Sequence, residues 1–149
     1  MYDFILAVHN ILRWIILILA IVALLRAYWG WSGKRDWTPT DRKVGSFYSI
    51  SLDVQLLLGL ILYFALSPIV SKNLGNFMSL LADKLFRFFA FEHMLMMIIA
   101  IILAHVGAAS SRRAVENTLK HRRAAIWFTL SVIALLLGMP WFRPLLPGF

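Results

Sequence analysis

The chain has 149 residues, of which 61% are hydrophobic and 15% are charged, and its formal net charge is +8. Soluble domains average about 45–50% apolar and roughly 25% charged residues, so this composition predicts a single integral membrane domain over residues 1–149. The absence of cysteine excludes disulfides, thiolate metal sites, iron–sulfur clusters and covalent c-type haem attachment.

Four apolar segments are long enough to cross a membrane. A spanning helix needs about 20 predominantly apolar residues, and it must be helical because lipid satisfies no backbone N–H or C=O group. The segments cover approximately residues 4–27, 45–67, 86–108 and 124–141. The first lacks a basic leader and a small-residue cleavage site, which indicates a retained span and not a signal peptide.

Local signals predict where these helices begin and end. Gly30 and Gly33 are expected to end the first helix, and Thr38 or Thr40 is expected to cap the second. A proline ends each of the second and fourth segments. Residues 73–84 alternate apolar and polar side chains, which predicts a short helix lying in the membrane interface.

The basic residues predict the orientation of the spans. They gather in the first and third connections, which hold Arg26, Lys34, Arg35, Arg42 and Lys43, and Arg112, Arg113, Lys120, Arg122 and Arg123. Basic loops stay on the cytoplasmic side, so both termini are expected outside. Short connections make consecutive helices antiparallel neighbours, which predicts an up-down-up-down four-helix bundle. The positive charge then meets anionic lipid head groups, and nucleic-acid binding is not expected.

Several polar residues lie at similar depths inside the predicted spans. At about 1.5 Å per residue, His9, Arg13, Glu92 and His93 all lie on the order of 10 Å from the outer face or one turn deeper. Asp53 lies near the middle of the second span. A charged group at the centre of a membrane helix costs roughly 2.5–3.5 kcal/mol. These residues are therefore expected to share the bundle core, with Arg13 paired to Glu92 or Asp53.

The two histidines at matched depth allow three interpretations. Each could simply donate a hydrogen bond across helices. Paired imidazoles from facing helices are also how a four-helix bundle holds haem b, with His9 and His93 as axial ligands and Arg13 and Glu92 around them. Alternatively, His9 and His93 with either Asp53 or Glu92 make a two-histidine-one-carboxylate set for a metal ion, although Arg13 would repel that cation.

Further side chains fit a haem site or stand outside it. Met94, Met96, Met97 and Ala100 are flexible or small enough to line a porphyrin. The haem propionates could pair with Arg13, Lys84 or Arg87. Methionines are nevertheless commoner as core filler. His105 lies near the inner surface, and its only candidate partner, His121, falls in the basic inner loop, so a second haem is not expected. His121 is expected to titrate at the surface or to contact lipid phosphate.

Five short strings occur together over most of the chain: "HNILRW" at 9–14, "DRKVG" at 41–45, "LLLGL" at 56–60, "FRFFAFEH" at 86–93 and "KHRR" at 120–123. In this order and spacing the chain resembles small four-helix membrane proteins of Bacteroidota-type bacteria that are labelled cytochrome b-like. The resemblance implies haem b, the bacterial inner membrane, and His9, Arg13, Glu92, His93 and His121 as characteristic polar positions. Relatives can carry histidine where this chain has Asp53, so a haem here would depend on His9 with His93.

Two main functions follow as hypotheses. The first is a haem b-type electron-transfer protein or subunit that links a quinol pool to a partner at the outer face. The second is a cofactor-free accessory subunit of a larger respiratory or transport complex, in which the polar cluster fixes helix register. A metal-ion or proton pathway through Asp53, His9 and Glu92 is the third. No signature of hydrolytic or group-transfer chemistry is present, so an independent enzyme is not expected.

Overall fold

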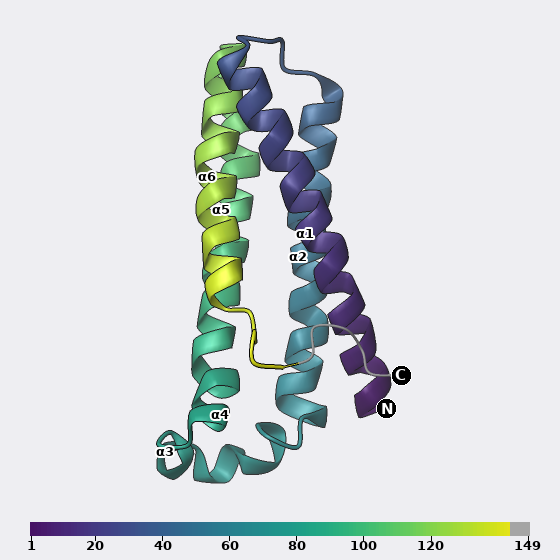
Figure 1. Cartoon of the computed structure of the whole chain (residues 1–149), viewed down its shortest axis with the longest axis vertical. Helices are drawn as coiled ribbons and strands as arrows, with labels where there is room; N and C mark the ends of the chain where they lie inside the picture. Colours follow the sequence, from purple (N-terminus) through teal and green to yellow (C-terminus); the bar gives the residue numbers. More distant parts are fainter. Residues whose placement is uncertain (144–149) are drawn as a thin grey trace.

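The computed structural model describes residues 1–143, and these residues form helices and turns without a strand, which confirms the all-helical prediction. Four long helices dominate it: α1 (Tyr2–Ser32), α2 (Pro39–Ile61), α5 (His93–Arg113) and α6 (Asn117–Leu137). Each packs mainly against two of the others, in the order α1, α2, α5, α6 and back to α1. The pair α1 and α2 converges with α5 and α6 at the upper end and diverges from it below (Figure 1).

Short elements join α2 to α5. A π-helix, η1 (Leu62–Leu66), prolongs α2, and α4 (Lys84–Arg87) with a second π-helix, η3 (Phe88–Glu92), leads directly into α5. Between them lie a 3-10 helix, η2 (Ser71–Asn76), and one α-helical turn, α3 (Phe77–Leu80). Of the short helix predicted over about 73–84, residues 73–80 are helical. Turn residues 81–83 interrupt it, and Asp83 instead caps α4 by accepting a hydrogen bond from Phe86 N.

Three helical segments are long and apolar enough to cross a membrane: Tyr2–Ser32, Pro39–Leu66 and Lys84–Arg113. The chain is thus built as a membrane protein, with apolar helix surfaces suited to lipid. The fourth helix, α6, differs because its first two turns carry Lys120, Arg122 and Arg123, which leaves residues 124–137 as its uncharged part.

The ends predicted for the first helix and the start of the second agree with the structure, with one exception. Thr38 is the N-cap of α2, as predicted: its Oγ1 accepts a hydrogen bond from Asp41 N, and Asp41 Oδ2 accepts one from Thr38 N at 2.8 Å. Asp41 also pairs with Arg26 of α1 at 2.8 Å, which ties the two helices together. The exception is Gly30, which lies inside α1; the helix ends at Ser32, just before Gly33.

Small residues let the four helices approach closely. Alanines and glycines hold most of the buried positions of α1, α5 and α6, and the close approach that they permit is the usual basis of helix packing in membranes. They are Ala20, Ala23, Ala27 and Gly30 on α1, Ala100, Ala104 and Gly107 on α5, and Ala124, Ala125 and Ala134 on α6. Many of the larger apolar side chains are exposed, for example Ile18, Leu57 and Ile102, and can meet lipid.

A chain of two hydrogen bonds joins three helices in the core. The Tyr48 hydroxyl on α2 donates to Ser131 Oγ on α6 at 2.8 Å, and Ser131 donates in turn to the Ala100 carbonyl on α5 at 2.7 Å. Tyr48 and Ser131 have no exposed surface. Because water does not reach this place, a lost partner leaves a polar group unsatisfied.

We therefore expect Tyr48→Phe to lower the free energy of unfolding by about 1 kcal/mol. The matched control is Tyr28→Phe, since the Tyr28 hydroxyl makes the same kind of bond, to Thr129 at 2.8 Å, on an exposed surface. Unfolding of both variants in detergent, followed by circular dichroism, checks the difference. Equal losses would show that the buried bond carries no special weight.

Candidate functional site

A cavity of about 400 Å³ lies where α1 and α2 diverge from α5. Most of its walls are apolar, and a few polar side chains converge on it from different elements. Polar side chains at its centre include His9, Asn10 and Arg13 from α1, Gln55 from α2 and His93 from α5, with Met94 and Met97 beside them. Tyr2, Asp3, Tyr63 and Ser67 add further polar groups to the lining. Met139, Pro140 and Arg143, which follow α6, line it as well.

His9 and His93, which lie at matched depth, meet in this cavity. Their ring centres are 6.5 Å apart, and the ring planes are inclined by 62°. They come from helices α1 and α5, which are separated by the whole of α2 in sequence. The structure thus brings the two imidazoles to a common interior point, which their matched depth alone left open.

Neighbouring groups hold each imidazole in place. His93 Nδ1–H donates to the Gly138 carbonyl at 2.7 Å, and this carbonyl is available because Gly138 ends α6. That bond fixes the tautomer and leaves Nε2 of His93 as the acceptor or ligand atom. His9 packs beside Gly59 of α2, where a Cβ would lie 3.6 Å from its Cε1. Its Nδ1 is buried and has no hydrogen-bond partner among residues 1–143.

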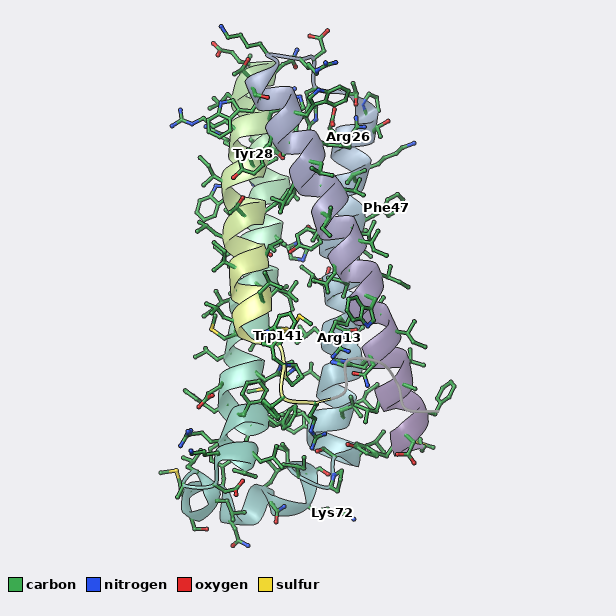
Figure 2. All side chains as sticks on the ribbon, in the orientation of Figure 1. Arg13, Arg26, Tyr28, Phe47, Lys72 and Trp141 are labelled. Atoms are coloured by element: carbon green, nitrogen blue, oxygen red, sulfur yellow. The ribbon has the colours of Figure 1, made fainter. Side chains whose placement is uncertain are left out.

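Arg13 lies one helical turn from His9 and lines the same cavity. It is only 7% exposed, and its Cζ lies 5.8 Å from the centre of the Trp14 ring. Figure 2 shows it in the half of the molecule where the helix pairs diverge. The cavity therefore combines two imidazoles with a guanidinium close by.

Glu92 does not reach the cavity, and the predicted pairing with Arg13 is wrong. Glu92 Oε1 accepts a hydrogen bond from Arg87 Nε at 2.8 Å, and both side chains are about half exposed. The cause is η3: in a π-helix residues five apart lie one above the other, so Glu92 stands over Arg87. His93, which follows directly, is turned inward.

Asp53 is also outside the cavity, so its predicted pairing with Arg13 is wrong too. Its Oδ1 lies 2.8 Å from Nε2 of His105, on the outer surface of α2 and α5. With Asp53 and Glu92 both elsewhere, the two-histidine-one-carboxylate set is not assembled. No group of three histidine, aspartate or glutamate side chains that could hold a metal ion occurs in the part of the chain described.

His121 is a buried residue of α6 and not part of a solvated loop, which corrects the expectation that it titrates at the surface. It is 2% exposed and packs directly against Gly30 of α1. Its ring centre lies 4.9 Å from that of Trp37, and its Nε2–H donates to the Asp36 carbonyl at 3.4 Å. Its contacts give it a packing role between α1, α6 and the α1–α2 connection.

Sequence reasoning missed Gln55, which donates to the His9 carbonyl at 2.9 Å, and Gly138, which orients His93. Gln55 lies four residues before Gly59 and so shares its helix face, a spacing that could have indicated the site. No signal pointed to Gly138, because its role depends on where α6 ends. Comparison with protein-family models, curated proteins and solved structures finds no match to this chain.

Proposed function

We propose that this chain is a membrane haem b-type electron-transfer protein in which His9 and His93 are the axial ligands. The distance between the two rings carries the proposal. An imidazole nitrogen lies about 2.0–2.1 Å from a bound first-row metal and roughly 1.1 Å from its own ring centre, so two axial rings have centres roughly 6–6.5 Å apart. The His9 and His93 ring centres are 6.5 Å apart.

Other features of the cavity suit the same cofactor. Its volume of about 400 Å³ falls in the range of roughly 300–1,000 Å³ that is usual for ligand sites. The buried, unpartnered Nδ1 of His9 is a polar atom that a ligand contact would explain. The Gly138 carbonyl orients His93 as outer groups orient metal-binding histidines. Arg13 and Arg143 supply cations for the two propionates.

Haem held here would supply one-electron chemistry through its iron. The protein's own residues would bind it, orient it and set the charge around it, with Arg13 as the nearest cation on α1. Electrons would pass between a quinol pool in the bilayer and a partner at the outer face, because the cavity lies in the half of the molecule away from the basic end.

The charge distribution supports four crossings with both termini outside, and the resemblance to small bacterial membrane proteins implies the inner membrane. Ten of the 15 lysines and arginines lie between residues 26 and 43 or between 112 and 123, at the end where α1 meets α2 and α5 meets α6. Positive residues are retained on the cytoplasmic side. The α6 helix completes the four-helix arrangement, with its basic first turns at that same end.

The haem content of purified protein tests this proposal. Wild-type protein from haem-replete cells is expected to show a sharp Soret band and about one haem b per chain. His9→Ala and His93→Ala should each lose it, because each variant removes one of the two proposed iron-binding nitrogens. The matched control is His105→Ala, which removes an imidazole outside the cavity and should keep the haem. Colourless wild-type protein with native helix content would contradict the proposal.

An accessory-subunit role is the second candidate, favoured by the half-exposed Asp53–His105 pair on a surface otherwise suited to lipid. Ionisable groups in membranes usually face protein or a water-filled space. Colourless protein that co-purifies with other membrane subunits in fixed ratio would favour this role over electron transfer.

A further inference from the structure

The outer surface of α2 and α5 carries a polar pair in an apolar setting. Asp53 and His105 are joined at 2.8 Å, and their side chains are 45% and 50% exposed. Both lie well inside helical segments that are long and apolar enough to cross a membrane. The residues one turn away, Ile50, Leu57 and Ile102, are 54%, 61% and 56% exposed. This surface would therefore place an acid and an imidazole against hydrocarbon.

Hydrocarbon is a poor environment for this pair. Ionisable side chains within membrane spans almost always face a protein interior or a water-filled cavity. The single hydrogen bond uses one carboxylate oxygen and one ring nitrogen. Oδ2 of Asp53 and Nδ1 of His105 make no hydrogen bond within residues 1–143. Asp53 Oδ2 can therefore accept one more hydrogen bond, and Nδ1–H of a protonated His105 can donate one.

We propose that this surface binds a second copy of the same chain. Two copies in one membrane are related by a two-fold axis along the membrane normal, which reverses every direction within the membrane plane. The α2 helix of one copy then faces α5 of the other, and each Asp53 carboxylate lies at the depth of the other copy's imidazole. The two ion pairs run antiparallel, and each acid gains a second base.

Charge complementarity favours a second copy of this chain, and not an unrelated helix, as the partner of this surface. The surface bears both an acid and a base, so it is complementary to itself once it is rotated, and symmetry matches the depths without further adjustment. The remaining apolar residues around the pair are aliphatic, which suits close helix packing. Neither Asp53 nor His105 lines the cavity between α1 and α5, so the dimer stands apart from the haem proposal.

Disulfide trapping between two differently tagged chains tests the dimer, and the chain offers a clean background because it has no cysteine. One chain carries Leu57→Cys and the other Ile102→Cys, co-expressed and oxidised in native membranes. These residues lie one turn to the outer side of Asp53 and His105, so they face each other across the proposed axis. The control pair is Ile18→Cys on α1 with Ile133→Cys on α6, which are 60% and 49% exposed on the opposite side.

The expected result is a mixed disulfide of two chains, formed several-fold more readily than in the control pair. Asp53→Leu with His105→Leu in both chains should reduce it to the control level. The exchanged variant, Asp53→His with His105→Asp, rebuilds the same pair in reverse and should restore it. Equal trapping in test and control pairs, capture of a different protein, or unchanged trapping in the leucine variant would overturn the proposal. Circular dichroism of each variant verifies the fold, and haem content is read separately.

Discussion

Gly30→Ala is expected to lower the free energy of unfolding by about 1–3 kcal/mol, the usual range for overpacking a filled core. A Cβ at this position would collide with three atoms of the His121 ring, Cε1, Nδ1 and Nε2. His121 cannot move away easily, because it is 2% exposed and held between α1 and Trp37. Chemical or thermal unfolding in detergent, followed by circular dichroism, measures the loss.

Two comparisons isolate this collision from the general effect of the substitution. Gly75→Ala makes the same change where no atom lies within 4 Å of the new Cβ, so it should leave stability nearly unchanged. Gly30→Ala combined with His121→Ala should cost less than the sum of the two single changes, because the added methyl group enters the space that the ring leaves. Additive losses would show that α1 and α6 do not meet at this point.

Gly59→Leu is expected to weaken haem binding while it preserves the fold. Gly59 lines the cavity beside His9, and the cavity is open enough that a Cβ makes an ordinary contact of 3.6 Å with the imidazole. The remaining atoms of a leucine extend into the space proposed for the porphyrin. We expect at least about a tenfold loss of haem affinity, equal to roughly 1.4 kcal/mol, measured by titration of purified apoprotein.

The size series at this position supplies the control. Gly59→Ala adds only the atom for which room exists, so it should bind haem nearly as wild type does. Helix content and unfolding temperature should stay close to wild type in both variants, because the added atoms enter a cavity and not a packed interface. Full haem binding by Gly59→Leu would place the cofactor site elsewhere.

The sequence predicts the helices and the matched depth of His9 and His93 for simple reasons. Apolar length identifies the spanning segments, and the Thr38 cap follows from side-chain chemistry within three residues. Depth along a helix scales with residue number, so two positions at equal depth can be recognised without coordinates. Depth predicted the level of the site correctly.

The depth of a residue does not predict the rotation of its helix about the helix axis. The π-helix η3 inserts a wider turn just before His93, so positions on either side of it differ by about 100° from a continuous α-helix. That change sends Glu92 to Arg87 and turns His93 inward. Similarly, Asp53 faces His105 and not Arg13 because the close packing of small residues sets the rotation of α5. Neither feature has a local signature in the residue pattern.

Titration of purified apoprotein with ferric haem, followed by optical and electron paramagnetic resonance spectroscopy, tests most directly whether His9 and His93 bind one iron together. We expect saturation at about one haem per chain, a six-coordinate low-spin spectrum, and conversion to a high-spin spectrum or loss of binding in either His9→Ala or His93→Ala. A wild-type spectrum that neither substitution alters, or the absence of saturable binding by folded protein, would contradict it.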